Sequence, residues 1–553
     1  MRRGGGGGGG CAAHPARMRS ANAIDSIRLI TNLPIRVRGR ADAKGVPGGV
    51  PAPKYGREAG KRFRDGKKAV EARCGTRTIS EAGVRIRRFA ERETGGPLRR
   101  SVAIGAVLLA VCFLILYVLT MSPGVYLGDS GELAAAGALL DIPHPPGYPL
   151  YTLLARLFVV AGFGPIAARA NALSAIAGAV SIALFFLLAR SRFSATAALL
   201  GALLLGFSSL LWSQAAVAEV YALHLAIFLL FLLVVSHADS ARRRISAAWI
   251  GGLAAAAHPL GFGLFPLLLV AGWANGNEGR SKRALLLQAF AFLAPLSLFL
   301  YLPIRSACDP PTDWGNPETA RAFWSHVLRL GYRDVPKPDA SFSLWFGEMV
   351  ALVRGASGNI GAPLLALAPL GLFSPALRRR RGFLVPLAGF LLYGPLLAAY
   401  VRFPLAPERV EENSVFFLPA LALLLFFVSS GADLLLAACR GRRPLHAGLI
   451  ATFGIVAAVR FGSALPSHRY DQVALPEAYA RDVLTGVPSG ATLVAAGDDM
   501  VFPLLFLQRA LGVRPDVDIR DADGIVFPAP EDRGAGGRYF TYPAPGLAPA
   551  GLH

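Results

Sequence analysis

Acidic, imidazole and phenol side chains gather in one short stretch of the chain, residues 128–151. Asp129 and Glu132 are three residues apart and precede an Ala- and Leu-rich segment that is predicted to be helical, and His144 and Tyr148 follow in the run His-Pro-Pro-Gly-Tyr-Pro. A carboxylate held beside a helix N-terminus can act as a general base toward a hydroxyl group. Prolines fix φ and Gly147 permits a turn, so this rigid run could aim His144 and Tyr148 at a common target.

A structural explanation is open for both features. Asp129 could be the N-cap of the helix, with Glu132 reaching back to its backbone N–H as in a capping box. Rigid Pro-Gly segments also occur in plain connections between helices. The catalytic and capping interpretations of Asp129 are compatible, because a cap fixes geometry. The sequence contains no HExxH motif, catalytic triad or Gly-rich phosphate loop, so it identifies no cofactor, although the two carboxylates could bind a divalent cation.

The composition places these residues in a membrane protein. Hydrophobic residues make up 54% of the 553 residues, charged residues 17%, and the mean hydropathy is +0.46, which excludes a simple cytosolic enzyme. The net charge of +22 does not indicate a nucleic-acid partner, because residues 1–100 alone hold 24 Lys and Arg against 8 Asp and Glu. The five cysteines form no zinc-site or disulfide pattern. The expected partner is therefore the lipid bilayer.

The predicted fold is an all-α polytopic membrane protein of about eleven transmembrane helices. A bilayer span takes roughly 20 apolar residues, or fewer where a helix is broken. The apolar blocks cover residues 101–121, 170–189, 195–214, 216–236, 245–273 (two short spans broken at His258-Pro259), 284–304, 358–373, 383–401, 415–438 and 446–459.

The charges predict the topology. If the N-terminus is cytoplasmic, the Arg clusters within residues 190–192, 242–244, 280–283, 378–381 and 440–443 all fall on the cytoplasmic side, as the positive-inside rule requires. The loops over residues 122–169 and 305–357, the short loop 402–414 and the C-terminal tail then lie on the outer side. Asp129 and its neighbours would therefore act at the outer face of the membrane.

Three regions follow from this organisation. Residues 1–96 have a disordered, basic composition and form either a cytoplasmic arm or the product of a start codon placed too early, Met18 being an internal alternative. Residues 97–461 form the transmembrane domain. Residues 462–553 form an extracytoplasmic region with a small α/β element, predicted from helices at 476–484 and 501–511 and strands at 491–496 and 517–520, with an irregular end. Asp498 and Asp499 are expected to cap the second of these helices.

Several motifs in this order resemble those of one membrane-protein family. The first is Gly-Asp-Ser-Gly-Glu-Leu at 128–133 with His-Pro-Pro-Gly-Tyr-Pro-Leu at 144–150; the others are Trp-Ser-Gln at 212–214, Glu-Val-Tyr at 219–221, Tyr-Leu-Pro-Ile-Arg-Ser at 301–306 and Trp-Gly at 314–315. The tail adds Gly-Asp-Asp-Met-Val-Phe-Pro-Leu at 497–504 and Gly-Val-Arg-Pro-Asp-Val at 512–517. The chain is similar over roughly residues 101–524 to a former domain-of-unknown-function family whose animal members are protein O-mannosyltransferases acting on plexin-type receptor domains.

The resemblance implies a glycosyltransferase of the GT-C class. Such an enzyme moves a sugar, mannose in the animal members, from a polyprenyl-phosphate carrier to a hydroxyl acceptor at the outer or lumenal face. A carboxylate of the first outer loop acts at the reacting centre, so Asp129 is expected to be the base, with Glu132 as its companion. The acceptor would be protein Ser or Thr, or another hydroxylated component of the envelope. The high content of Ala, Gly and Arg favours a bacterial inner membrane.

A departing lipid phosphate needs positive charge. Arg305, at the outer end of its span, is the first candidate because a guanidinium can hold two phosphate oxygens, and Arg402 is the second. For each, the alternative is an Arg that snorkels from a helix end. Glu219 at a membrane boundary is costly unless it is paired or functional, and Trp314 could stack on a sugar or simply pack on its own loop. The family often carries a richer His cluster where this chain has only His258, which puts a role for His258 in doubt.

A transporter or flippase of lipid-linked saccharides is the alternative function. Transporters usually have related halves and charged residues near the bilayer midplane. This sequence shows no evident repeat between its halves, and its carboxylates are predicted to lie on one outer face. These features favour the enzyme.

Overall fold

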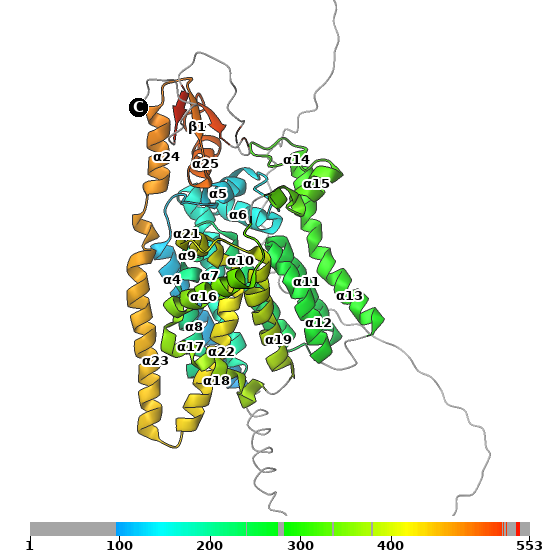
Figure 1. Cartoon of the computed structure of the whole chain (residues 1–553), viewed down its shortest axis with the longest axis vertical. Coiled ribbons are helices and arrows are strands. Elements are labelled where there is room, and N and C mark those ends of the chain that lie inside the picture. Colours follow the sequence, from blue (N-terminus) through cyan, green and yellow to red (C-terminus); the bar gives the residue numbers. More distant parts are fainter. Residues whose placement is uncertain are drawn as a thin grey trace, which may run out of the picture. The chain divides into compact units, whose positions relative to one another are not determined.

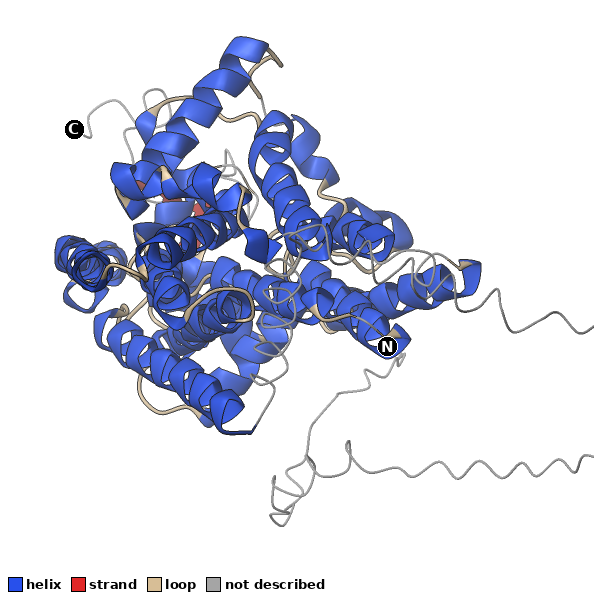
Figure 2. Ribbon diagram, turned by 90° about the horizontal axis from the view of Figure 1, so that it is seen from below, coloured by secondary structure: helices blue, strands red, loops and turns tan. Residues whose placement is uncertain are grey.

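The computed structural model describes residues 96–541, except for 239, 275–280, 335–336, 378–379, 523, 525–526 and 528–537 (Figure 1). The predicted basic arm over residues 1–96 lies outside this part of the chain, apart from its last residue. Helices make up nearly all of the described structure, with one small patch of strand (Figure 2).

The long helices confirm a multi-pass membrane protein. Six have the length and apolar character to cross a bilayer, and eight do if each bent pair counts as one span. The predicted number of about eleven also includes shorter apolar helices such as α10 (Val220–Ser236). The helices of the bundle are α4 (Gly96–Thr120), α7 (Ile166–Arg190), α8 (Ala195–Gly206), α9 (Ser209–Ala216), α10, α11 (Ala241–Ala257), α12 (Leu264–Ala274), α13 (Lys282–Leu293), α19 (Arg380–Leu391), α20 (Leu397–Val401), α22 (Leu418–Cys439) and α23 (Arg443–Ala464).

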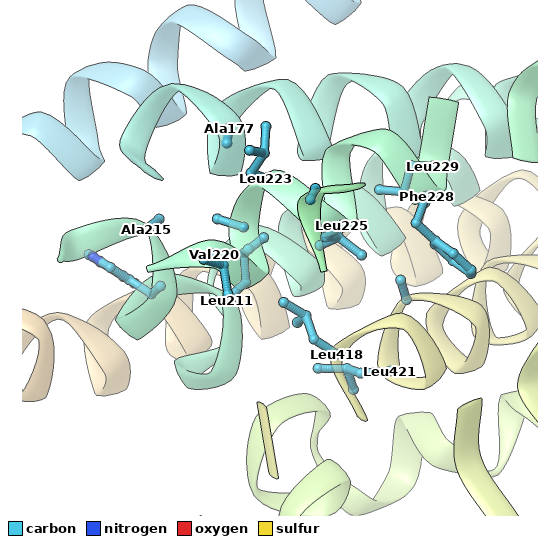
Figure 3. Close-up of a cluster of buried hydrophobic side chains, with 14 of the residues drawn as sticks. Ala177, Leu211, Ala215, Val220, Leu223, Leu225, Phe228, Leu229, Leu418 and Leu421 are labelled. Carbon is cyan, nitrogen blue, oxygen red and sulfur yellow. The ribbon is translucent and has the colours of Figure 1, made fainter. Parts of the chain in front are cut away.

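The core lies where α7, α9, α10 and α22 meet. Leu211, Leu225 and Phe228 are fully buried there, and Leu418 joins them from α22 (Figure 3). Small residues let the helices approach closely, as in other membrane bundles. A Cβ on Gly178 of α7 would come within 2.7 Å of the Ala215 methyl group. The many Ala and Gly residues of the apolar blocks therefore serve packing.

The two loops that are predicted to lie on the outer side contain more helix than the sequence predicted. The first loop folds into α5 (Ser130–Leu139) and α6 (Pro149–Ala161), and the second contains α14 (Tyr301–Ser306), α15 (Ala320–Val327) and α16 (Phe342–Ile360). The predicted boundary between loop and span at residue 358 was wrong, because α16 runs through it. The chain bends by 111° after α16, at Gly361 with φ +97°, into α17 (Ala362–Leu365) and α18 (Leu367–Leu372).

The tail forms the predicted α/β element. Its helices are α24 (Leu475–Gly486) and α25 (Asp498–Leu505), and β1 (Thr492–Ala495) pairs in parallel with β2 (Asp518–Asp521). A third parallel strand, β3 (Arg538–Phe540), was not predicted and completes the order β2-β1-β3. A three-residue strand between Gly- and Pro-rich segments is too short to produce a recognisable alternation. The end of the chain that was expected to be irregular, with Pro543, Pro545 and Pro549, lies outside the described residues.

The tail packs against the first outer loop. In Figure 1, α24, β1 and α25 lie at the same end of the molecule as α5 and α6, away from the turn between α22 and α23. Gly131 of α5 allows this contact, since a Cβ there would come within 2.5 Å of the Phe502 carbonyl oxygen in α25. The second glycine of the Gly-Asp-Ser-Gly-Glu-Leu motif is therefore needed for close packing against the tail.

Candidate active site

Asp129, Glu132 and His144 form one cluster at the N-terminus of α5. Glu132 Oε2 lies 2.6 Å from His144 Nδ1, and the backbone N–H of His144 donates to Glu132 Oε1 at 2.8 Å. Asp129 Oδ2 lies 3.7 Å from His144 Nε2. The Glu132 side chain is 1% exposed, whereas that of Asp129 is 31% exposed. Asp129 is thus the carboxylate of this cluster that a substrate can reach.

The capping-box interpretation was wrong. Asp129 occupies the N-cap position of α5, but its side chain makes no capping hydrogen bond, and its φ and ψ are already helical. Glu132 turns away from the N-cap toward His144. The hydroxyl of Ser130 accepts the backbone N–H of Tyr126 instead. Because neither carboxylate is used as a cap, both are available for the chemistry of the cluster.

The His-Pro-Pro-Gly-Tyr-Pro run holds His144 in place. Left-handed backbone at Gly147 (φ +89°) and Tyr148 (φ +38°) turns the chain into α6. The turn brings the Tyr148 hydroxyl to 2.9 Å from His144 Nε2. The Trp314 ring centroid lies 6.1 Å from that of His144, in an edge-to-face arrangement. The structure therefore joins five predicted site residues from two loops: Asp129, Glu132, His144, Tyr148 and Trp314.

The carboxylates favour a protonated His144. Burial alone would lower the pKa of His144, but the charges of Asp129 and Glu132 and the hydrogen bond that His144 donates to Glu132 raise it to about 9. An imidazolium can then donate from Nδ1 to Glu132 and from Nε2 toward Tyr148 and Asp129. Burial raises the pKa of Glu132, and the contact with His144 opposes that rise. At neutral pH His144 is the cation that balances its acidic neighbours.

Acidic residues of the tail hold the first loop. Asp499 Oδ1 accepts the Gly128 N–H at 2.8 Å, and Glu477 Oε2 accepts the Val125 N–H at 3.1 Å. The predicted capping role of Asp498 and Asp499 was therefore wrong: the N-cap of α25 is Gly497, and no side chain caps it. Burial raises the pKa of Asp498 to about 6, and the charges of Asp129 and Glu132 add to the shift. The tail therefore contributes directly to the surroundings of Asp129.

The two predicted phosphate-binding arginines are not joined to the Asp129 cluster by any hydrogen bond or ion pair among the described residues. Arg305 donates from Nε to the Leu140 carbonyl at 2.8 Å and from an Nη atom to the Leu139 carbonyl at 3.2 Å, so it satisfies the C-terminus of α5. Arg402 follows α20 in a left-handed conformation, next to Phe403. Within the described residues, no hydrogen bond or ion pair joins Arg402 to the Asp129 cluster.

Arg329 is the cation that the sequence analysis missed. It follows α15 with φ +54°, and its guanidinium lies 4.5 Å from the centroid of the Tyr332 ring. Burial raises the pKa of Tyr332 to about 12, and the charge of Arg329 opposes that rise. The charge of Arg329 likewise opposes the rise in the pKa of His144 and of Tyr148. Arg329 therefore lies within electrostatic reach of the cluster, although no sequence motif marks it.

Two further groups lie beneath the cluster. Glu219 precedes α10, and Ser174 Oγ contacts both its backbone N–H and its carbonyl, each at 3.0 Å. Burial raises the pKa of the Glu219 carboxyl well above its usual range, and the charge of Asp129 adds to the effect. His258, whose role the sequence left in doubt, stacks on Tyr148 with ring centroids 5.9 Å apart and planes 9° from parallel. The structure thus places His258 next to the predicted site.

The cluster also has the donor set of a metal site. One ligand atom each from Asp129, Glu132 and His144 lies within 4.8 Å of the others. The Glu132 carboxylate contacts Nδ1 of His144, while Nε2 of His144 faces Asp129. This is the arrangement in which a carboxylate orients a metal-binding imidazole. A divalent cation would be held by Asp129 and His144 Nε2, and would supply positive charge to a phosphate group. Binding it would require His144 to lose its Nε2 proton.

Comparison with known proteins shows which family this chain is similar to. Residues 129–278 match the family described as the Protein O-mannosyl-transferase TMEM260 N-terminal domain, and this segment begins at Asp129. The predicted family resemblance is confirmed. The chain is 29% identical to the mouse Protein O-mannosyl-transferase TMEM260 over 78% of its own length, and 28% identical to the tmem260 protein of Dictyostelium discoideum over 42%. It spans 64% and 32% of the lengths of these two TMEM260 proteins.

The fold has a solved counterpart. ArnT from Cupriavidus metallidurans in the apo state aligns with a TM-score of 0.50 and 15% identity, over 77% of this chain and 90% of that chain. This likeness concerns the fold alone. The likeness to ArnT agrees with the predicted helical membrane fold. The similarity to the TMEM260 proteins is a separate observation, made from the sequence alone.

Proposed function

We propose that this protein transfers a sugar from a polyprenyl-phosphate carrier to a hydroxyl group of a protein acceptor. The similarity to protein O-mannosyltransferases indicates that the sugar is mannose. The family resemblance supports the reaction class, and the Asp129–His144–Glu132 cluster supports the location of the chemistry. The observation that carries the proposal is the division between the two carboxylates: Glu132 is buried against His144, whereas Asp129 is partly exposed. An exposed carboxylate with a fixed neighbour suits general base catalysis.

The cluster would act by an inverting displacement. The acceptor hydroxyl gives its proton to Asp129 as its oxygen forms a bond to the anomeric carbon of the sugar. The bond from that carbon to the phosphate oxygen breaks, and its electron pair leaves with the lipid phosphate. The imidazolium of His144, fixed by Glu132, orients the Asp129 carboxylate by its charge.

Arg329 would stabilise the departing phosphate. Arg305, the first candidate from the sequence, already donates to the carbonyls at the end of α5, so its guanidinium is largely occupied. The Arg329 guanidinium rests on Tyr332 and acts electrostatically on His144 and Tyr148. Guanidinium groups bind phosphate oxygens through two parallel N–H bonds. Arg329 is therefore the better placed of the two for a phosphate beside the cluster.

A cavity beside His144 suits the acceptor. It has a volume of about 380 Å³ and is lined by Pro145 of the first loop and by residues of the second loop, including α15: Trp314, Gly315, Thr319, Arg321, Ala322, Ser325, His326 and Gly331. Trp314 borders both this cavity and His144. A polypeptide segment in the cavity could pack against the Trp314 ring while its hydroxyl group approaches Asp129.

The proposal includes the predicted topology and regions. About eleven spans, counting the shorter apolar helices, leave the N-terminus in the cytoplasm and the tail from residue 462 on the outer side of a bacterial inner membrane. The contacts of Asp499 and Glu477 with the first loop support a tail on the same side as Asp129. An outward-facing lipid-linked donor would then meet Asp129 at the membrane surface.

The test is transfer by the purified protein. Polyprenyl-phosphate mannose with a radiolabelled sugar would be incubated with envelope proteins extracted from a strain that lacks the gene. We expect the label to appear in protein, and mass spectrometry to locate it on Ser or Thr. Movement of the intact labelled lipid across a vesicle membrane, without any transfer to protein, would instead support the transporter alternative.

A further inference from the structure

Buried polar atoms without partners lie below the Asp129 cluster. His258 is 2% exposed, and its Nδ1 accepts the backbone N–H of Leu260 at 3.2 Å. Because Nδ1 is an acceptor, the proton of the neutral ring is on Nε2. Among the described residues, Nε2 of His258 has no hydrogen-bond partner, and neither has Oε2 of Glu219. Buried donors and acceptors are rarely left unpaired in a native protein, so each of these atoms needs an explanation.

These atoms lie close to the reacting centre. The His258 ring is stacked on Tyr148, whose hydroxyl is 2.9 Å from His144 Nε2. Tyr221 is the second residue of α10, and its ring centroid lies 5.0 Å from that of His258. Glu219 lies two residues before Tyr221, within electrostatic reach of Asp129. A single aromatic ring, that of Tyr148, therefore separates His258 from the histidine that contacts both carboxylates.

The chemistry of these side chains suits a pyranose. Carbohydrate sites combine aromatic faces, which cover the C–H side of a sugar ring, with a few polar groups that bind its hydroxyls. The Nε2–H of His258 is a donor, and the carboxyl of Glu219 offers an acceptor and, when protonated, a donor.

We propose that Glu219, Tyr221 and His258 bind the hydroxyl groups of the donor sugar, directly below the Asp129 cluster. This subsite deepens the proposed function and rests on it. It would position the anomeric carbon between Asp129 and Arg329 while the sugar hydroxyls satisfy the unpaired polar atoms. Binding of the lipid phosphate would depend on Arg329 and only weakly on these three residues.

The two nitrogens of His258 allow a sharp pair of variants. His258→Asn places an amide oxygen near the position of Nδ1, so it retains an acceptor for the Leu260 N–H and removes the free donor. His258→Gln places an amide nitrogen near Nε2 and so retains a donor. Glu219→Gln keeps the shape and polarity of the Glu219 side chain, and Glu219→Ala removes both. His468→Asn is the matched control, because His468 is also buried but its ring contacts Trp212 and Tyr470, not Tyr148.

The measurement compares two ligands for each variant. Equilibrium binding to the purified protein would be determined for polyprenyl-phosphate mannose and for sugar-free polyprenyl phosphate. We expect His258→Asn and Glu219→Ala to weaken binding of the sugar-bearing lipid by about tenfold, the loss typical of one buried hydrogen bond. Binding of the sugar-free lipid should stay at the wild-type value. His468→Asn should bind both lipids as the wild type does. His258→Gln and Glu219→Gln should retain more affinity for the sugar-bearing lipid than His258→Asn and Glu219→Ala do.

Each other outcome has a distinct meaning. If His258→Asn and Glu219→Ala bind both lipids as the wild type does, or lose both equally, the polar atoms are satisfied by water or serve the fold, and the sugar subsite is overturned. The proposed function then still stands, provided that the wild-type protein transfers mannose. A wild-type protein that binds neither lipid would overturn the proposed function and the subsite together.

Discussion

Glu132 Oε2 lies 2.6 Å from His144 Nδ1, with both side chains buried beside the partly exposed Asp129. This contact gives the two acidic residues of the Gly-Asp-Ser-Gly-Glu-Leu motif different roles. Glu132 fixes the ring and charge of His144, and Asp129 remains available to a substrate. The predictions below separate these roles from each other and from the stability of the fold.

Removing the charge of Glu132 should slow sugar transfer, because Glu132 acts on the reaction by holding His144. In Glu132→Gln the amide oxygen can still accept a hydrogen bond, but it no longer stabilises an imidazolium. We expect the rate to fall about tenfold or more, as for other carboxylates that orient a histidine. The dependence of the rate on pH separates this from misfolding, since the pH at which His144 loses its proton should shift downward. A folded Glu132→Gln protein with the wild-type pH profile would contradict the assigned role.

The folded protein should lose stability as the pH rises through the pKa of His144. This pKa is about 9, above its ordinary value of 6.5, so the folded state holds the proton more tightly than the unfolded chain does. The resulting stabilisation is complete below pH 6.5 and disappears as the pH rises through about 9. One pKa unit corresponds to about 1.4 kcal/mol, so the loss is at most about 3 kcal/mol.

Thermal unfolding in detergent, measured across this pH range, would check the effect. The wild-type unfolding temperature should fall between neutral pH and the pKa of His144. In His144→Gln this dependence should flatten, since the titrating ring is absent. An equally steep fall in both proteins would assign the effect to other groups.

Arg329 and Arg305 should differ when each is replaced. Arg329→Ala should raise the KM for the polyprenyl donor by at least about tenfold, because a charge-assisted contact with phosphate is lost, and Arg329→Lys should restore part of the affinity. Arg305→Ala should instead lower thermal stability, because the carbonyls of Leu139 and Leu140 lose their donor. Donor titrations and unfolding curves of the three variants would check this. If Arg329→Ala has the wild-type KM for the donor, a cation other than Arg329 binds the lipid phosphate.

The tail should stabilise the first outer loop. Asp499→Ala removes the acceptor for the Gly128 N–H, and Glu477→Ala removes the acceptor for the Val125 N–H. Each loss should destabilise the loop by about 1 kcal/mol, the usual contribution of one partly exposed hydrogen bond. Limited proteolysis would report it as faster cleavage within residues 122–128. Asp518→Ala is the control, since Asp518 contacts Arg520 within β2 and not the loop.

Much of this structure could be predicted from the sequence. Apolar blocks and Arg clusters predicted the membrane fold, and Asp129, Glu132, His144 and Tyr148 were brought together as their rigid loop suggested. Periodicity and turn residues predicted β1 and β2 of the tail. These features depend on the local sequence, so residue composition and spacing are enough to predict them.

Features that depend on contacts across the chain could not be predicted in this way. Arg329 stands in an unremarkable segment, and only the fold of α15 against the Pro-Pro-Gly run brings it near His144. His258 seemed isolated because its partner, Tyr148, is 110 positions away in the chain. The capping interpretation of Asp129 failed for the same reason: the sequence shows a helix start, but not that His144 folds back to bind Glu132.

Asp129→Asn tests the central claim most directly. Asparagine has nearly the same shape and makes no demand on the helix, which Asp129 does not cap, so the variant should insert and fold as the wild type does. It cannot accept the acceptor's proton at neutral pH. Transfer of mannose from polyprenyl-phosphate mannose to protein by the purified variant should therefore fall by a factor on the order of 10² to 10⁴. An Asp129→Asn protein that transfers mannose at the wild-type rate would contradict the account.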